Sequence, residues 1–522
     1  MTNRKRFFYN GILLTLVGLA MRSVGMFFGA FVSRAVGAEG VGLYTLIMTV
    51  YSFALTLATS GVGITVTRHV AASVAEEGEG SEGGVMLGAF IYALVFGICS
   101  FSLLFFGAEF IGLRIIHDGR TVASFKILAL SLIPNALSSV LCGYFVGVKR
   151  VFANAAVQVA SNIFKIAITV ILVFANLTEN IGKSVFYICL GMTLTELLSF
   201  VALLVQYLIF RSAGGRRQNE LREISKTAMP LAFSAYVRSA LLTLEHILIP
   251  KKLREYRSDA KEALSDYGTL HGMALPIVMF PMAPLSSFAG LLVPEFAGGM
   301  ASGDSKRVSR ICSESIGATL SYATVISVFL LLFSEELGYI IYSSYEAGRF
   351  ISVLAPIVPI MYLDHVTDAI LKGIGEQVYS MWVNIADSFL SVVLVCLLIP
   401  KLGILGYAVV IIIMEAFNFA LSFLRLKRKI SFSLAALKNI LSPLISAVVA
   451  SCLTDRLFAM NGSCTSALWL VMKIVFTVAA FIGTNTVLSA VCRAVLEKAV
   501  KLFQKRKMQT KDGIKAKNKP AT

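Results

Sequence analysis

Ionisable side chains lie inside long apolar segments of this 522-residue chain. A charge in hydrocarbon costs on the order of 3 kcal/mol or more unless it faces a partner or a polar cavity, so each of these residues is a candidate for function. The cationic ones are Arg22, Lys165, Arg238 and Lys473. The remaining ones are Glu196, Glu245, Asp364, His365, Asp368, Asp387 and Glu415.

Two arginines occupy equivalent places in the two halves of the chain. Arg22 lies in the first apolar segment and Arg238 in the seventh, so we expect both to line a cationic central cavity. A guanidinium presents a planar fork of donors that matches phosphate oxygens, so this pair suits a pyrophosphate headgroup. A second explanation stays open for each residue: Arg238 pairs with Glu245, two turns away, and Arg22 pairs with another carboxylate.

Three further cations are candidates for substrate binding. Arg34 and Arg68 lie at the ends of apolar segments, where snorkelling to the membrane surface is an alternative explanation. Lys165 lies inside the fifth segment and carries a charge in mid-membrane.

A compact group in the tenth segment suggests ion coupling. Asp364 and Asp368 are one helical turn apart, beside His365, and Glu245 is a fourth candidate. Such a group could bind Na⁺ or carry a proton. A polar patch between helices, or one facing external water, explains the same residues.

The sequence predicts neither an enzyme nor a resident cofactor or metal. It contains no GxxxxGK[ST], HExxH or GxSxG motif, and its eight cysteines form no CxxC pair or Cys/His cluster. ATP is therefore excluded as the direct energy source.

Composition requires a membrane protein. The chain is 57% hydrophobic and 15% charged, with a mean hydropathy of +0.78, and a water-soluble domain cannot bury such an excess. We predict an all-α membrane protein with about fourteen transmembrane helices. They are expected near 9–35, 41–67, 85–107, 121–148, 151–175, 184–210, 228–250, 267–297, 308–333, 350–371, 378–400, 403–424, 440–458 and 466–490.

Basic residues indicate the orientation. Segments on the side of the N-terminus carry 30 Lys and Arg, and those on the other side 12, which predicts that both termini are cytoplasmic. The net charge of +17 therefore reports topology and not a nucleic-acid partner. The basic tail from Lys498 to Lys519 is either simply solvated or docked on anionic membrane lipids.

The chain also shows an internal duplication. The fourth segment of each half ends in a glycine-rich turn, at 143–147 and 372–375, and the sixth carries Glu196 or Glu415. Four prolines, at 276, 281, 284 and 294, interrupt the eighth segment. We predict an N-terminal lobe of six helices (1–210), a basic cytoplasmic linker (211–227), a C-terminal lobe of six helices (228–426), an extra pair of C-terminal helices (427–497) and a basic cytoplasmic tail (498–522).

Several stretches resemble one known family. They are Ala20–Tyr44, Ser60–Gly63 followed by Arg68, Gly143–Gly147, Pro230–Leu253 and Ala355–Val378. In order and spacing they resemble the stage V sporulation protein B family. This family is in the polysaccharide transporter branch of the multidrug/oligosaccharidyl-lipid/polysaccharide exporter superfamily.

The resemblance implies two six-helix lobes around a central cavity that opens alternately to each side. It also implies an undecaprenyl-linked substrate and arginines in the cavity, which Arg22 and Arg238 match. The chain departs from the family pattern at Cys142 and Ser161, while Lys165 keeps a charge nearby.

The sequence therefore predicts a flippase in the bacterial cytoplasmic membrane. Its substrate would be an undecaprenyl-linked oligosaccharide or peptidoglycan precursor for the cell wall or the spore cortex. The rival hypothesis is a cation-coupled drug or metabolite exporter of the same superfamily.

Overall fold

The computed structural model describes residues 3–77, 83–148, 150–176, 180–210, 221–432, 442–459 and 471–486, and single residues 469 and 488. Every regular element in these ranges is helical, which confirms the predicted class. The first half contains α1 (Asn3–Thr59), α2 (Val62–Glu77), α3 (Gly83–Phe110), η1 (Ile111–Ile116), α4 (Arg120–Ala129), α5 (Leu132–Gly147), α6 (Val151–Ala175) and α7 (Ile181–Phe210). The second half contains α8 (Leu221–Arg257), α9 (Ala260–Tyr267), η2 (Gly268–Ala274), α10 (Leu275–Met279), η3 (Phe280–Met282), α11 (Ala283–Ala301), α12 (Ser305–Leu332), α13 (Ser334–Tyr342), α14 (Tyr345–Leu354), η4 (Ala355–Ile357), α15 (Val358–Gly373), α16 (Gln377–Leu402), α17 (Ile404–Lys429) and α18 (Ser442–Ala459).

The helices are long enough to make a multi-pass membrane protein. Ten described segments could each cross a bilayer, or eleven if the bent pair α4 and α5 counts as one span. One of them, Ala20–Val74, has 55 residues, and its helical rise adds up to about 80 Å along the chain. That is enough for two crossings of about 30 Å. Helices α18 and 471–486 are shorter, so the total of fourteen spans stays a prediction.

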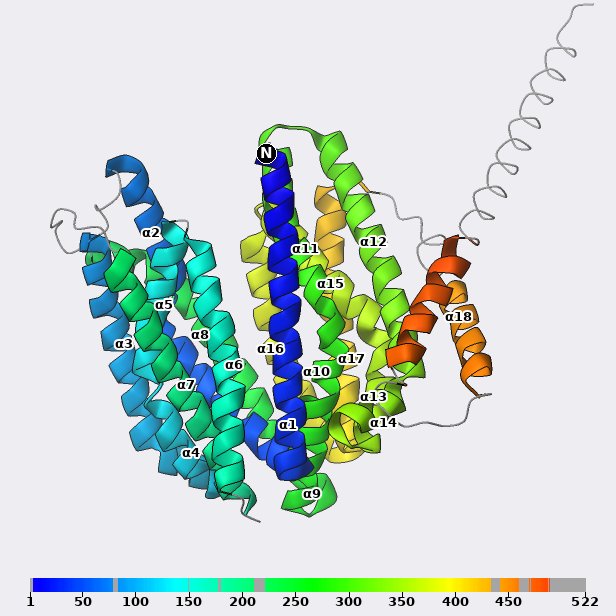
Figure 1. The fold of residues 1–522 in the computed structure, drawn as a ribbon, viewed down its shortest axis with the longest axis horizontal. Helices are drawn as coiled ribbons and strands as arrows, with labels where there is room; N and C mark the ends of the chain where they lie inside the picture. The colour runs from blue at the N-terminus through cyan, green and yellow to red at the C-terminus, as the bar shows by residue number, and fades with distance from the viewer. Residues whose placement is uncertain are drawn as a thin grey trace, which may run out of the picture.

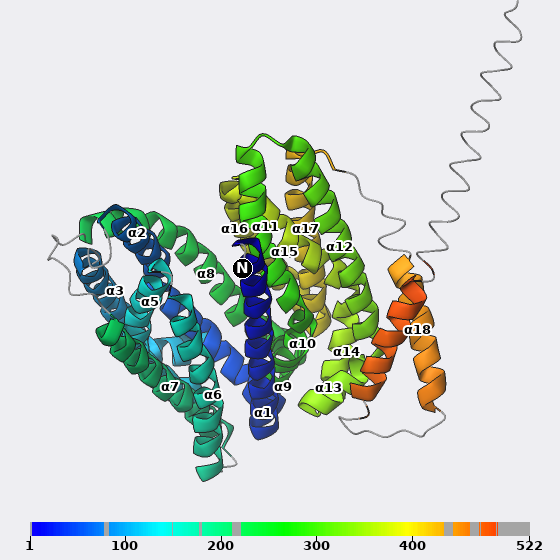
Figure 2. The ribbon, with the colours of Figure 1, turned by 45° about the horizontal axis from the view of Figure 1, so that its top comes forward.

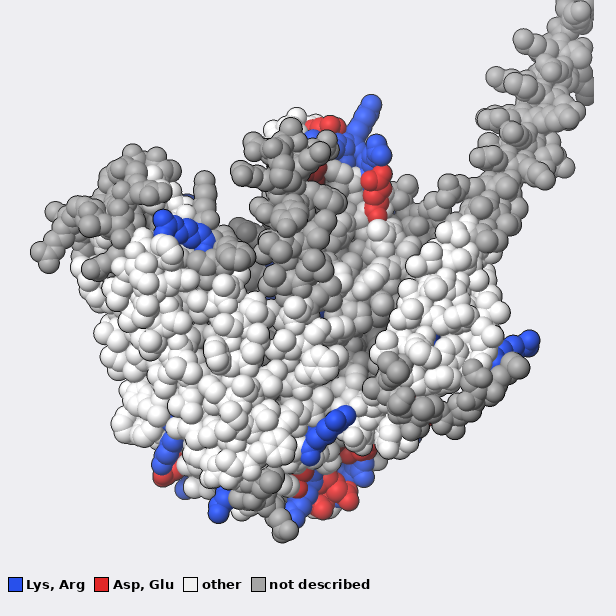
Figure 3. Space-filling model, in the orientation of Figure 1, with Lys and Arg blue, Asp and Glu red and all other residues white. Residues whose placement is uncertain are grey.

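The distribution of charged side chains is also that of a membrane protein. On the face drawn in Figure 3, charged side chains of the described residues gather at the two ends of the molecule, and the band between them is almost entirely uncharged. An uncharged band between two charged ends is what a bilayer requires of a spanning protein.

Helix α1 turns back on itself at Gly37. The backbone there has φ 68° and ψ −178°, a conformation that glycine adopts without a Cβ clash. The turn separates a first segment of α1 (3–36) from a second segment (38–59). It falls between the crossings predicted at 9–35 and 41–67.

Two bundles meet at the lower end of Figure 1 and diverge above it, as Figure 2 also shows. The left bundle holds α2 to α7 and the right bundle α10 to α17, with α18 packed against α12. Helix α1 contacts α11 of the right bundle, and α8 contacts α3 on the left and α16 on the right. Each bundle is thus in contact with the helix that opens the other half of the chain. The lobe boundaries at 210 and 228 stay a prediction.

The eighth predicted span is interrupted, as its prolines suggested. A π-helical turn (η2) and a 3₁₀ turn (η3) divide residues 260–301 into short helical pieces. Proline has no N–H and the 3₁₀ turn shifts the bonding pattern, so carbonyl oxygens lose their helical donors. Three carbonyls of this span accept hydrogen bonds from side chains of other helices: Val278 from Tyr362 (2.9 Å), Met279 from Arg22 (2.7 Å) and Pro281 from Tyr322 (2.7 Å).

Backbones touch where the bundles meet. A Cβ added at Gly42, in the second segment of α1, would lie 2.1 Å from the carbonyl oxygen of Leu264 in α9. A Cβ at Gly268 in η2 would lie 2.3 Å from the carbonyl oxygen of Ala38. The lower end is closed by direct contact between these two glycine positions.

We predict that Gly42→Ala destabilises the protein. The new methyl group collides with rigid backbone, and overpacking of this kind costs about 1–3 kcal/mol. Thermal unfolding in detergent should show a Tm several degrees below wild type. Gly298→Ala is the matched control, because nothing lies within 4 Å of its added Cβ. A Gly42→Ala protein as stable as the control would contradict the close contact.

The turn between α15 and α16 is held by an ionic clamp at the upper end of the molecule. Glu376 accepts hydrogen bonds from Lys429 (2.7 Å) and Arg425 (2.8 and 3.1 Å) of α17. The Lys429 ammonium and then the Arg425 guanidinium hold the pKa of this carboxyl below its ordinary value. The clamp is therefore complete while the carboxyl is ionised.

Glu376→Gln should lower the Tm at pH 7, and the loss should shrink in acid. Because the folded pKa is lowered, the stabilisation is present above the unfolded pKa of about 4.3 and disappears as the pH falls through the folded value. Thermal unfolding of both proteins between pH 3 and 7 measures this. Glu314→Gln removes an exposed pair with Arg310 and should change little. A Tm difference independent of pH would show that charge is not the cause.

Several predicted parts lie outside the described residues. They are residues 211–220 of the basic linker, most of the loop between the last two helices, and the basic tail 498–522.

Candidate transport site

Arg22 lies in the first segment of α1 and reaches the broken eighth span. Its Nη1 donates to the carbonyl oxygen of Met279 at 2.7 Å, and the side chain is half-buried. Its charge acts on Tyr362 and His365 of α15. Among the described residues Arg22 forms no ion pair with a carboxylate, so the alternative of a carboxylate partner finds no support there. Its other N–H groups make no hydrogen bond to the described residues.

Lys165 faces α1 from the left bundle. Its Nζ lies 5.5 Å from the ring centroid of Phe28, and its charge interacts with Glu196 of α7. Asn162, one turn earlier on α6, donates to the sulfur of Met21. Lys165 and Glu196 therefore attract one another across the left bundle without forming an ion pair, and Lys165 lies close to the helix that carries Arg22.

Five carboxylates form an acidic network in the right bundle. We use this name for Glu245 on α8, Asp364 and Asp368 on α15, Asp387 on α16 and Glu415 on α17. Asp364 interacts with Asp368 and Asp387, Glu415 with Asp364 and Asp387, and Glu245 with Asp387. The network thus draws on four helices.

Its members differ in how well they are satisfied. Asp368 pairs with Lys372 at 2.6 Å and accepts a hydrogen bond from Ser380. Asp364 and Asp387 each have a buried Oδ1 without a hydrogen-bond partner, and so does Nε2 of His365. The tight cluster predicted from residues 364–368 is therefore split into a paired carboxylate and two unpaired groups.

Such a network can take up positive charge. Carboxylates that share a buried site stay ionised only when a proton, a cation or water balances them. Among the described residues, no three Asp, Glu, His or Cys side chains are close enough to hold a metal ion. The arrangement suits proton uptake or a loosely held monovalent cation better than a compact metal centre.

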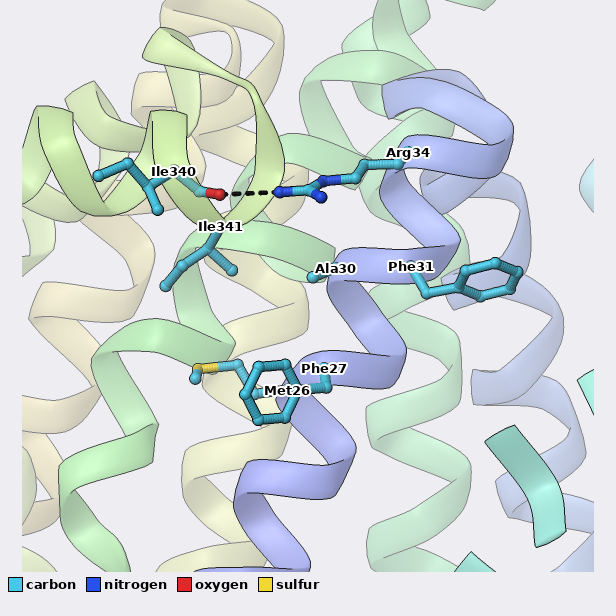
Figure 4. Close-up of a pocket in the computed structure, with 7 residues that line it drawn as sticks. All are labelled: Met26, Phe27, Ala30, Phe31, Arg34, Ile340 and Ile341. Carbon is cyan, nitrogen blue, oxygen red and sulfur yellow. Dashed lines mark hydrogen bonds between the residues drawn. The ribbon is translucent and has the colours of Figure 1, made fainter. Parts of the chain in front are cut away.

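The other predicted arginines have different neighbours from Arg22. Arg238 is exposed on α8 and its charge acts on Asp387, and the predicted alternative of an ion pair with Glu245 is wrong. Arg68 is exposed on α2 and makes no hydrogen bond or ion pair with the described residues. Arg34 is exposed near the lower end of α1, where it donates to the carbonyl oxygen of Ile340 at 3.0 Å (Figure 4).

Two members of the acidic network were not among the predicted ion-coupling residues. Asp387 and Glu415 had been recognised only as intramembrane charges. The internal repeat could have singled out Glu415, since it occupies the place of Glu196 in the first half. Only the packing of α16 against α8 and α17 shows that Asp387 lies between the others.

The fold is similar to those of solved membrane transporters. The structure is similar to the inward-facing conformation of a multidrug resistance transporter of the MATE family, in the MOP superfamily, with a TM-score of 0.67 and 15% identity over 80% of this chain and 98% of that one. It is also similar to the lipid II flippase MurJ in an inward closed conformation, with a TM-score of 0.71 and 13% identity over 91% and 98% of the two chains. At these identities the likeness concerns the fold alone.

The chain belongs to the polysaccharide biosynthesis protein family, whose profile matches residues 7–300, more than half of its length. A MatE profile matches residues 268–397. Stage V sporulation protein B of Bacillus subtilis (strain 168) is 23% identical over 422 residues, which cover 78% of this chain and 81% of that protein. Sporulation protein YkvU of the same organism is 22% identical over 360 residues, covering 67% and 79%. These findings confirm the family that the sequence motifs suggested.

Proposed function

We propose that this transporter flips an undecaprenyl-linked oligosaccharide or a peptidoglycan precursor across the bacterial cytoplasmic membrane. The observation that carries the proposal is the place of Arg22. It is a half-buried guanidinium near the middle of the first segment of α1, which runs between the two bundles, and among the described residues it donates to one neutral carbonyl, that of Met279. Membership of a polysaccharide biosynthesis family supports the substrate class.

A pyrophosphate headgroup is the ligand that such a guanidinium suits. Its charged oxygens make stronger hydrogen bonds with the donor fork than a carbonyl can. Lys165, across α1, offers a second positive charge. Arg238 stays a predicted partner of Arg22 in holding the pyrophosphate, and Arg34 and Arg68 stay predicted substrate contacts.

The orientation follows from the basic residues. Both termini would be cytoplasmic, which makes the diverging upper end of Figure 1 the cytoplasmic side. The basic tail would then meet the anionic lipids of the inner leaflet. The named sporulation relatives support a role in the cell wall or the spore cortex.

Arg22→Ala should reduce flipping about 10- to 100-fold without affecting membrane insertion. The loss corresponds to one or two charged hydrogen bonds of about 1.5–3 kcal/mol in total. The measurement is translocation of a fluorescent lipid II analogue in proteoliposomes, with insertion checked in membrane fractions. Arg22→Lys should fall between, because it keeps the charge but not the fork.

Arg349→Ala is the matched control, since Arg349 is an exposed arginine on α14 that lies outside the site. It should flip at the wild-type rate. Full complementation of a flippase-deficient strain by Arg22→Ala would show that the assigned role is wrong.

We propose further that the acidic network binds the ion that drives transport, either H⁺ or Na⁺. The unpaired oxygens of Asp364 and Asp387 support this, because they lack a donor in the structure described. The rival function, export of a drug or metabolite driven by the same cation, rests on the same network. It differs in substrate and not in coupling.

Asp364→Asn should abolish the dependence of transport on an imposed ion gradient, because the amide cannot exchange charge. Proteoliposomes with Na⁺ and pH gradients, loaded in turn with lipid II analogue and with a cationic dye, measure both coupling and substrate. Glu314→Gln, an exposed carboxylate outside the network, should behave as wild type. Flipping by wild type that does not depend on a gradient would contradict the coupling proposal. Dye export driven by a gradient, without flipping, would favour the drug or metabolite exporter.

A further inference from the structure

A pocket of about 380 Å³ lies between α1 and α13, and its Met26 end is one helical turn from Arg22. Its walls are Met26, Phe27, Ala30 and Phe31 of α1 with Ile340 and Ile341 of α13, and Arg34 lies at one end (Figure 4). Every lining residue except Arg34 is apolar. The pocket is therefore an apolar cleft with a single cation at its end.

The charge of Arg34 is not neutralised by protein. Its Nη2 donates to the carbonyl oxygen of Ile340, and no carboxylate pairs with it in the ranges that the structure covers. The guanidinium is exposed, so its other N–H groups are accessible. An anion can bind there without breaking an existing ion pair.

The pocket has the polarity of a lipid in one leaflet. Arg34 lies three residues before the turn at Gly37, where the chain reaches the lower end of the membrane span. Met26 lies eight residues earlier, about 12 Å deeper along the helix. Phe27, between them, has 67% of its surface exposed. A headgroup at Arg34 would therefore direct a hydrocarbon chain along the pocket toward the middle of the bilayer.

We propose that this pocket binds one anionic phospholipid of the leaflet at the lower end. The phosphate accepts hydrogen bonds from Arg34, and one acyl chain lies between α1 and α13. The volume is near the small end of ligand sites, which fits part of one chain and leaves the second chain in the bilayer. A phospholipid is favoured over the transported substrate because the guanidinium proposed to bind that substrate, Arg22, is directed to Met279 at a different depth.

Lipid bound here would join the first segment of α1 to the right bundle. Beside the pocket, Arg34 and Ser33 already join α1 to α13 by donating to the carbonyl oxygens of Ile340 and Tyr342. A bridging lipid adds apolar contact to both helices. The proposal needs no transported substrate. It does use Arg34, which is also a predicted substrate contact, so the experiment compares the phospholipid with undecaprenyl phosphate.

The test is native mass spectrometry of the full chain titrated with phosphatidylglycerol and with phosphatidylcholine. Wild type should retain one tightly bound phosphatidylglycerol in preference to phosphatidylcholine. Arg34→Gln should weaken that binding about fivefold, the effect of losing one basic contact of about 1 kcal/mol. Ala30→Leu should weaken it while keeping the charge, because the added side chain fills the pocket.

Arg349→Gln is the control, an exposed arginine at the same end that does not line the pocket. It should bind as wild type does. Equal binding by Arg34→Gln and wild type, or no preference for phosphatidylglycerol, would overturn the proposal. So would displacement of the bound phospholipid by undecaprenyl phosphate at equal concentration, which would assign the pocket to the substrate.

Discussion

The structure depends on hydrogen bonds to backbone carbonyls of the broken eighth span inside the membrane. Hydrocarbon offers no hydrogen-bond donors, so a carbonyl without a helical partner must find one within the protein. The broken eighth span has three carbonyls that accept hydrogen bonds from the side chains of Tyr362, Arg22 and Tyr322. These side chains come from α15, α1 and α12, so the break is also the point where three other helices are joined.

One helix connects this break to the closed end of the molecule. The first segment of α1 carries Arg22, and the second carries Gly42, whose backbone touches α9. Gly37 lies between them at the turn. A separation of the bundles at the lower end must break the contact at Gly42, and the same helix then pulls on the bond at Met279. Because the eighth span is already divided into short pieces, it can absorb such movement with few further hydrogen bonds lost.

Much of the fold could be predicted from the sequence because its determinants are local. Apolar length and proline positions indicated the helices and the interrupted eighth span, and the motifs around Arg22 indicated the family. The partners of the charges could not be predicted in this way. Helical spacing favoured a pair between Arg238 and Glu245, yet Asp387 on α16 interacts with both residues. Likewise, every residue has a backbone carbonyl, so side-chain types could not predict that Arg22 donates to Met279. Only the packing of the helices shows this partner.

In the proposed transport, this unexpected partner gives binding a mechanical consequence. If Arg22 turns its Nη1 toward a pyrophosphate, it gives up the bond to Met279, and a carbonyl left without a donor inside the membrane costs about 1–3 kcal/mol. Since each 1.4 kcal/mol changes an equilibrium about tenfold, substrate binding at Arg22 would shift the population away from the state in which α1 is held on the broken span. The same side chain would then recognise the headgroup and release the helix, and no separate sensor for the bound substrate would be needed.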